Sequence, residues 1–208
     1  MTQGRFITFE GGEGAGKSTQ VALLVDRLRA RGLEVVRTRE PGGSEGAEEI
    51  RAIALNGDAG RWSPMTETML MFAARSDHLD KTIRPALAAG RWVVCDRFAD
   101  SSRAYQGAGG GTPGEFIESL DAAVVGETQP DLTLIFDLPV EVGLERAFGR
   151  GLFETRFESK GVAFHERLRA RFLQIAEEKA ERCVVIDAVG DIETIEARVW
   201  AAVEARLL

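Results

Sequence analysis

The feature that most constrains this chain is a glycine-rich segment near its start, GGEGAGKS at positions 11–18. It fits the pattern G-x-x-x-x-G-K-[ST] and lies between a predicted strand at 5–10 and a predicted helix from Lys17 to about residue 31. Glycines let successive backbone N–H groups point at a polyphosphate, and the helix N-terminus adds a positive partial charge. We therefore predict a phosphate-binding loop, with Lys17 on the β- and γ-phosphates of a nucleotide and Ser18 as a ligand of Mg²⁺. The alternative is a glycine-rich turn that opens an ordinary helix.

The rest of the chain alternates short apolar segments with longer helical ones. Further strands are predicted at 34–38, 92–96, 132–137 and 183–187. The strands at 92–96 and 132–137 are almost continuously apolar, as in a parallel sheet that is covered on both faces. Two or three helices fill 45–89, and a last helix carries Ile192, Ile195 and Val199 on one face. The pattern predicts one α/β domain over 1–208, with a doubly wound sheet of about five parallel strands flanked by helices.

Composition excludes several classes of protein. The net charge of −7 argues against a nucleic-acid-binding protein that coats a duplex, because such a protein needs a basic face. No apolar run approaches the roughly 18–20 residues that span a bilayer, and the first residues do not resemble a signal peptide. Cys95 and Cys183 both lie in predicted strands, so we expect reduced core thiols. These features predict a cytoplasmic protein that binds neither nucleic acid nor membrane.

Two acidic residues near the loop have competing interpretations. Asp96 ends a predicted inner strand, where folds of this kind hold Mg²⁺; the alternative is a carboxylate that caps a helix. Glu13 lies inside the loop itself, which is unfavourable if phosphate is its only neighbour. A substrate hydroxyl or an arginine from elsewhere in the chain would explain it, and so would a solvated side chain that points outward.

Arginines outnumber lysines by 22 to four, and no guanine-reading N-K-x-D motif of a switch GTPase is present. Arginine favours bidentate recognition of phosphate, although most surface arginines are only solvated charges. Several arginines fall in loops or near predicted strand ends. They are Arg39, Arg75, Arg97, Arg103, Arg146, Arg150 and Arg156.

Five sequence blocks, in order and at the right spacing, resemble the bacterial thymidylate kinases, and the resemblance covers essentially the whole chain. They are FEGGEGAGKST at 9–19, TREPGG at 38–43, FAAR at 72–75, DRFxxSSxxYQG at 96–107 and PDLT at 130–133. Many families share the first block, whereas the second and fourth are much more specific. The resemblance implies a nucleoside monophosphate kinase fold, transfer of a phosphoryl group from Mg·ATP to dTMP to give dTDP and ADP, and a homodimer.

The resemblance also implies roles for individual positions. Glu13 matches a loop acid near the sugar and the transferred phosphoryl group, Arg97 an arginine at the acceptor phosphate, and Asp96 an acid beside the metal. Tyr105 matches an aromatic side chain that crowds the sugar 2′ position and so favours deoxyribose. The ATP-binding set is Gly11, Gly12, Glu13, Gly14, Ala15, Gly16, Lys17, Ser18 and Thr19. The acceptor-binding set is Arg39, Glu40, Arg51, Phe72, Arg75, Arg97, Ser101, Ser102, Tyr105 and Gln106, with Arg75 on the thymine edge.

One position departs from the family pattern. Many relatives place the aromatic residue that stacks on thymine four residues before the base-reading arginine, and here that position is Met71. Phe72 lies three residues before Arg75 and on nearly the same helix face, so we expect it to stack on the base. The alternative is ordinary core packing for Phe72.

The segment at about 147–157 has two glycines and little periodicity, and it lies where nucleoside monophosphate kinases carry a mobile lid. Since no residue at 12–15 of the loop is basic, we expect the lid to supply the cation that meets the charge of the transition state. Arg150 and Arg156 are the candidates and are ranked equally. The alternative for either one is a solvated surface charge.

Two rival functions fit parts of this pattern. One is a kinase for another nucleoside monophosphate, such as dUMP or dGMP, on the same scaffold. The other is a protein that binds nucleotide for regulation or assembly without transferring phosphate. Other features receive ordinary interpretations: His78 and His165 have no partners at zinc-ligand spacing, and the glycines at 107–111 predict a flexible loop.

Overall fold

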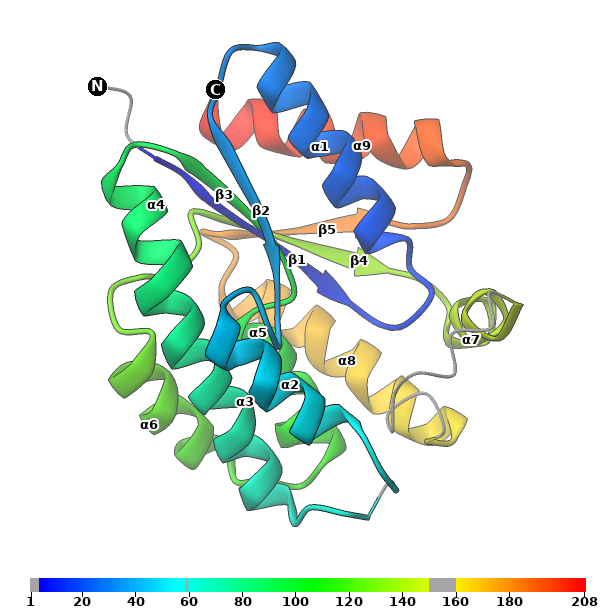
Figure 1. Ribbon diagram of the computed structural model, residues 1–208. Coiled ribbons are helices and arrows are strands. Elements are labelled where there is room, and N and C mark those ends of the chain that lie inside the picture. Colours follow the sequence, from blue (N-terminus) through cyan, green and yellow to red (C-terminus); the bar gives the residue numbers. More distant parts are fainter. Residues whose placement is uncertain (1–3, 59, 150–159) are drawn as a thin grey trace.

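The computed structural model describes residues 4–58, 60–149 and 160–208. Its centre is one sheet of five parallel strands in the order β2-β3-β1-β4-β5 (Figure 1). The strands are β1 (Phe6–Gly11), β2 (Val35–Arg39), β3 (Trp92–Asp96), β4 (Leu132–Asp137) and β5 (Cys183–Asp187). The predicted sheet is confirmed, and three strands have the predicted bounds. β1 and β2 each begin and end one residue later than predicted, which pairs Arg39 with Asp96 at the last position of the ladder.

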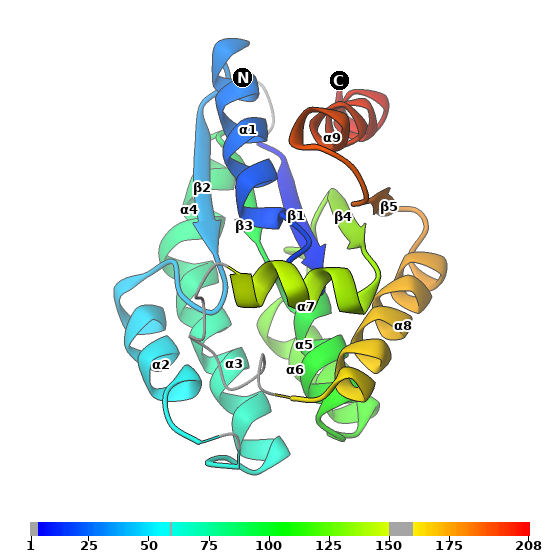
Figure 2. The same ribbon diagram turned by 90° about the vertical axis from the view of Figure 1, so that its right-hand side faces the viewer.

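Helices cover both faces of the sheet, as the doubly wound prediction requires. Figures 1 and 2 show α1 and α9 together on one face and most of the other helices on the opposite face. In chain order they are α1 (Lys17–Ala30), α2 (Glu45–Leu55), α3 (Pro64–His78), η1 (Leu79–Ile83), α4 (Arg84–Ala88), α5 (Ala99–Ser102), η2 (Arg103–Gly109), α6 (Gly114–Val124), α7 (Val140–Gly149), α8 (Val162–Glu178) and α9 (Ile192–Leu207). The segments η1 and η2 have the wider π-helical winding.

Strand alternation divides the core into two layers and decides what faces the site. In β1, Ile7 and Phe9 pack with α1 and α9, whereas Phe6 packs on the opposite face with residues of η1 and α5. Because successive side chains of a strand point to opposite faces, Thr8 and Glu10 share the face of Phe6. A buried threonine and a buried glutamate therefore stand on the face that carries α5 and η2.

Two expectations change in the structure. The glycines at 107–109 continue the π-helical η2 instead of forming a flexible loop, since η2 ends at Gly109. Gly109 also packs so closely on Phe164 that a Cβ there would lie 2.5 Å from the ring. Cys95 and Cys183 are free and buried, as expected.

Candidate active site

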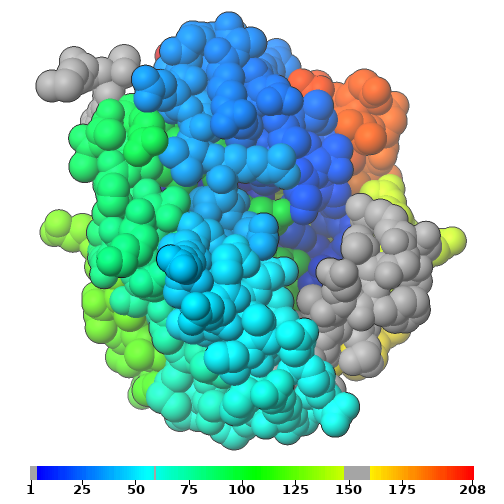
Figure 3. Space-filling model, viewed as in Figure 1, coloured from blue at the N-terminus to red at the C-terminus, as the bar shows by residue number. Residues whose placement is uncertain are grey.

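A cavity of about 330 Å³ opens at the carboxyl ends of β1, β2 and β3, where sites of doubly wound sheets lie. Figure 3 shows the surface hollowed between the blue N-terminal segments and the cyan segments of α2 and α3. Most of the predicted site residues line it: Glu13, Gly14, Ala15, Gly16, Lys17, Ser18, Thr19, Arg39, Glu40, Arg51, Arg75, Asp96, Arg97, Ser101, Ser102, Tyr105 and Gln106. Four of the five sequence blocks, which lie far apart along the chain, therefore meet in one place.

Three of the predicted residues that the structure describes are not among those that line the cavity. Gly11 and Gly12 lie at the start of the loop, and Phe72 is buried under the Arg75 guanidinium, whose carbon is 4.6 Å from the ring centre. Met71 lines the cavity in its place, which corrects the expected position of Phe72. The helix explains the difference: Phe72 packs against the arginine, while Met71, one residue earlier, reaches the cavity wall. Arg150 and Arg156 lie outside the described residues, as does most of the lid predicted at 147–157.

The phosphate-binding loop has the backbone that the glycine pattern predicts. Gly14 and Gly16 have φ angles of +69° and +83°, and Gly16 precedes the first residue of α1. A Cβ at Gly14 would collide with the carbonyl oxygen of Gly143 in α7, so only glycine fits there. The Lys17 ammonium donates to the carbonyls of Gly11 and Gly12, at 3.1 and 2.6 Å. Burial lowers the pKa of Lys17 to about 8, with the Arg97 charge acting in the same direction.

Glu13 is held by an arginine, which decides among the interpretations of its sequence position. Arg97 Nη2 donates to Glu13 Oε1 at 2.9 Å, and the Tyr105 hydroxyl donates to the same oxygen at 2.7 Å. The Arg97 guanidinium also lies over the Tyr105 ring, 4.9 Å from its centre. Burial alone would raise the pKa of Glu13, but the charges of Arg97 and Lys17 outweigh it and lower the pKa to about 2. Glu13 is therefore an ionised anchor for Arg97.

Arg97 itself occupies a conformation that is unusual for its residue type. Its φ of +69° is the only positive φ of a non-glycine residue in the described part of the chain. Buried Glu10 fixes the chain around it by accepting three hydrogen bonds. Its Oε1 accepts from the amides of Phe98 at 2.8 Å and Ser101 at 3.2 Å, and its Oε2 accepts from the Ser101 hydroxyl at 2.6 Å. Sequence reasoning gave Glu10 no role. The available signal for such a role was an acidic residue near the end of a buried strand, on the face that points into the protein.

The candidate metal ligands are adjacent. The Ser18 hydroxyl donates to Asp96 Oδ2 at 2.6 Å, at the junction of the loop and the end of β3. Among the described residues, no group of three or more His, Cys, Asp and Glu side chains is arranged to hold a metal ion. Two hard oxygen donors, with the remaining positions left to water and phosphate, are the set that suits Mg²⁺ at a nucleotide site.

Arg75 is a buried cation that is fixed on one side only. Its Nε donates to Glu40 Oε2 at 2.8 Å, and its Nη2 donates to the Phe98 carbonyl and the Ser102 hydroxyl, both at 3.1 Å. Nη1 is buried and has no hydrogen-bond partner in the described residues. A buried guanidinium nitrogen without an acceptor carries a desolvation cost, so it marks where a ligand oxygen fits.

Four further residues predicted for the acceptor site make contacts within the protein. Glu40 was predicted to contact substrate, but both of its oxygens are taken, one by Arg75 and the other by His78. Arg39 is half exposed and pairs with Glu48, and Arg51 donates to the Pro41 carbonyl at 2.7 Å. Gln106 donates to Glu67 at 3.0 Å.

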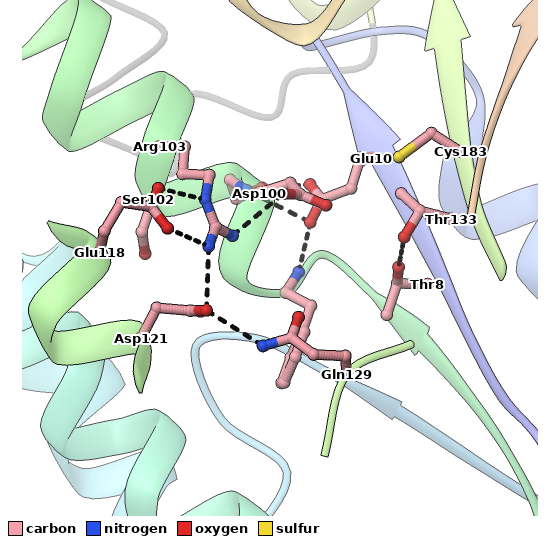
Figure 4. Close-up of polar contacts among 12 residues, drawn as sticks. Thr8, Glu10, Asp100, Ser102, Arg103, Glu118, Asp121, Gln129, Thr133 and Cys183 are labelled. Atoms are coloured by element: carbon pink, nitrogen blue, oxygen red, sulfur yellow. Dashed lines mark hydrogen bonds and ion pairs between the residues drawn. The ribbon is translucent and has the colours of Figure 1, made fainter. Parts of the chain in front are cut away.

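Behind the cavity lies a buried ion network, which Figure 4 shows in part. Asp100 of α5 accepts two hydrogen bonds from Arg182, at 2.8 and 3.0 Å, and one from Arg103 at 3.1 Å. Arg103 also pairs with Glu118 and Asp121 of α6. Burial would raise the pKa of Asp100, but the hydrogen bond and charge of Arg182 lower it overall. Arg103, which the sequence grouped with candidate phosphate ligands, is thus a structural cation that ties α5 and η2 to α6.

Comparisons with known proteins agree with this geometry. A family model described as thymidylate kinase matches residues 9–199. A thymidylate kinase of Caulobacter vibrioides is 60% identical over 207 residues, which cover 100% of this chain and 99% of the relative. One from Afipia carboxidovorans is 50% identical, over 99% of this chain and 91% of the relative. A crystal structure of thymidylate kinase from Ehrlichia chaffeensis, 33% identical, superposes with a TM-score of 0.78 over 97% of this chain and 98% of that one. None of the described helices has the length and apolar character to cross a membrane.

Proposed function

The chain belongs to the thymidylate kinase family, a group of nucleoside monophosphate kinases in nucleotide biosynthesis, and we propose that its loop binds Mg·ATP while its cavity binds dTMP. One observation supports the assignment of the two ends of the site. A single cavity joins the phosphate-binding loop to the buried Arg75, whose Nη1 has no hydrogen-bond acceptor among the residues that the structure describes. The acceptor nucleotide then lies with its phosphate toward Arg97 and its base toward Arg75.

The reaction follows from this orientation. An oxygen of the dTMP phosphate attacks the γ-phosphorus of ATP, the bond from that phosphorus to the bridging oxygen breaks, and ADP leaves with the electron pair. Lys17 exchanges its contacts with the Gly11 and Gly12 carbonyls for the β- and γ-phosphates, and Arg97 holds the acceptor phosphate. Bound Mg²⁺, held through Ser18 and Asp96, would neutralise phosphate charge. Arg39, which is half exposed at the cavity rim, supplies further positive charge for the acceptor.

Recognition of the nucleoside uses the opposite end of the cavity. Arg75 Nη1 donates to a carbonyl oxygen on the base edge, and Met71 supplies an apolar contact for the ring. The Tyr105 ring, fixed between Arg97 and Glu13, restricts the space beside the sugar. A ribose hydroxyl in that space would collide with the ring, so the deoxyribose form is favoured.

A competition assay tests the substrate assignment. Purified protein with Mg·ATP receives dTMP alone and in competition with dUMP, UMP, dCMP and dGMP, and each product is measured. We expect dTDP as the preferred product. Preference for another nucleotide would assign the chain to a kinase for that nucleotide, and ATP binding without ADP release would favour a nucleotide-binding module without transferase activity.

We also propose that the protein is a cytoplasmic homodimer, as the family resemblance implies. Light scattering coupled to size-exclusion chromatography measures the molar mass in solution. A mass near twice the 22.7 kDa of the chain is expected, and a mass near that of one chain would refute the dimer.

A further inference from the structure

The orientation of Arg75 depends on His78, a side chain that does not line the cavity. The Arg75 guanidinium is held on its Nε side by Glu40 Oε2. The second oxygen of Glu40, Oε1, lies 3.0 Å from Nδ1 of His78, a residue with no exposed surface. If Glu40 rotated, Arg75 would lose its charged partner, and its guanidinium would keep only the contacts of Nη2 that the structure describes, to the Phe98 carbonyl and the Ser102 hydroxyl. The carboxylate therefore needs a second anchor, and His78 is that anchor.

The hydrogen bonds fix which ring nitrogen of His78 carries the proton. A carboxylate paired with arginine only accepts, so Nδ1 must donate to Glu40. Nε2 lies 2.7 Å from the Thr38 hydroxyl, which can donate to it. In this arrangement the ring donates to Glu40 at Nδ1 and accepts from Thr38 at Nε2. The result is a series of hydrogen bonds that runs from Thr38 through His78 and Glu40 to Arg75.

The backbone at Gly43 leaves space for this series of hydrogen bonds. Gly43 has a φ of +89°, and a Cβ there would collide with both His78 Nε2 and the Thr38 hydroxyl. The same glycine is held independently, because the Thr82 hydroxyl donates to its carbonyl at 2.7 Å. Thr82 thus supports the loop beside His78, and no hydrogen bond links it to Glu40. It offers a matched control for effects that come only from loosening this loop.

We propose that His78 is a positioning residue for recognition of the acceptor base: its Nδ1–H orients Glu40, and Glu40 aims Arg75 into the cavity. The inference rests on the proposed function, in which Arg75 contacts the base. His78 touches no reacting atom, so its loss should weaken binding of dTMP and leave the transfer step almost unchanged. His78 has no partners at zinc-ligand spacing, and the role proposed for it follows from its hydrogen bonds with Glu40 and Thr38.

Two amide substitutions separate the two ring nitrogens. The amide nitrogen of asparagine can stand in for Nδ1, whereas that of glutamine stands in for Nε2. We expect His78→Asn to keep the KM for dTMP within about threefold of wild type, and His78→Gln to raise it about tenfold, as the loss of a hydrogen bond to a charged group predicts. For both variants, kcat should stay within about twofold, because the interaction is equal in the ground and transition states.

Two further variants complete the test. Thr38→Val, which keeps the side-chain shape and removes the donor to Nε2, should raise the KM for dTMP in the same direction as His78→Gln. It also serves if His78→Gln does not fold. Thr82→Val should leave the KM unchanged. Equal KM increases in His78→Asn, His78→Gln and Thr82→Val would overturn the proposal, and so would a fall in kcat at constant KM or no effect at all.

An Arg75 variant distinguishes this proposal from the function on which it rests. Arg75→Met should raise the KM for dTMP more than any His78 variant. If it does not, the assignment of Arg75 to the base is wrong, and the proposed function is revised at that point. If Arg75→Met raises the KM and His78→Gln does not, only the role of His78 is refuted.

Discussion

Arg97 donates to the Glu13 carboxylate across 2.9 Å, and this ion pair explains why an acid stands inside a loop built for phosphate. The carboxylate compensates an arginine that would otherwise repel Lys17 in a partly enclosed space. Because its pKa is about 2, Glu13 is ionised throughout the neutral range and has no proton to give. In the proposed reaction its contribution would be to orient Arg97, together with the Tyr105 hydroxyl.

Substitution of Tyr105 separates its ring from its hydroxyl. From sequence, Tyr105→Phe is expected to change little, because the ring that crowds the sugar remains. The structure gives the hydroxyl a hydrogen bond to Glu13 at 2.7 Å, so we expect Tyr105→Phe to lower kcat several-fold, as the loss of one hydrogen bond to a charged group predicts. Preference for the deoxyribose substrate should remain.

Tyr105→Ala removes the ring as well, so the preference for dTMP over its ribose counterpart should narrow. The measurement is kcat/KM for both nucleotides with wild type and the two variants. An unchanged preference in the alanine variant would remove Tyr105 from the sugar site.

Lys17→Met should abolish phosphoryl transfer and preserve the fold. Within the part of the chain that the structure describes, the ammonium donates hydrogen bonds only to the loop carbonyls of Gly11 and Gly12. Methionine fills the same volume without the charge that phosphate requires. Steady-state kinetics and thermal unfolding test both parts, with Lys81→Met on the exposed surface of η1 as the control. Activity within tenfold of wild type would contradict the assignment of the loop.

Local patterns in the sequence were sufficient to predict the sheet and the phosphate-binding loop, whereas most of the acceptor side of the cavity was predicted from the family resemblance. Three strands were predicted with the observed bounds, because continuous apolar runs such as residues 132–137 have few alternatives in an α/β chain. The glycine pattern specified the loop because its backbone conformation needs residues without a side chain. Asp96 and Ser18 meet because the carboxyl ends of parallel strands share one edge of the sheet.

Contacts between distant segments were beyond reach from one sequence. Nothing in the local pattern distinguishes Arg103, which is buried among carboxylates, from Arg39, which is half exposed at the cavity rim. The role of Glu10 depends on the fold of the chain around 97–101, and that of His78 on a partner 38 residues away. Phe72 and Met71 are adjacent on one helix, so only the packing of α3 decides which of them reaches the cavity.

Glu10 should make the stability of the protein depend on pH. Burial raises its pKa from 4.5 to about 7, and the charge of Asp100 adds to the effect. Between these values the folded chain holds a proton that the unfolded chain has released, so raising the pH favours unfolding across this window. A difference of about 2.5 units, at roughly 1.4 kcal/mol per unit, corresponds to about 3 kcal/mol.

Glu10→Gln removes this titration and keeps an oxygen that accepts from the Phe98 amide. Relative to wild type, the variant should gain about 3 kcal/mol in the free energy of unfolding between pH 4 and pH 8. Urea denaturation at several pH values measures the difference. Glu115→Gln, which changes an exposed carboxylate of α6, is the control and should show no such gain. Parallel pH profiles for wild type and Glu10→Gln would show that the Glu10 proton is not coupled to folding.

The last prediction concerns the cation that meets the charge of the transition state. None of the residues at 12–15 is basic. The cations that line the described cavity are already assigned to the phosphate-binding loop or to the acceptor site: Lys17, Arg39, Arg51, Arg75 and Arg97. The lid predicted at about 147–157 begins within the last turn of α7, and Gly143 of that helix packs against the loop at Gly14. Arg150 and Arg156 are the candidates.

Arginines in this role are worth on the order of 10³–10⁵ in kcat. Arg→Ala at the responsible position should lower kcat by a factor of this size, while the KM for dTMP hardly changes, because Arg75 and Arg97 hold the acceptor. Arg→Lys should restore only part of the rate, since an ammonium lacks the planar fork of a guanidinium. The measurement is kcat and both KM values for Arg150→Ala, Arg156→Ala and the double variant. If all three keep a kcat near that of wild type, the charge is met elsewhere in the site.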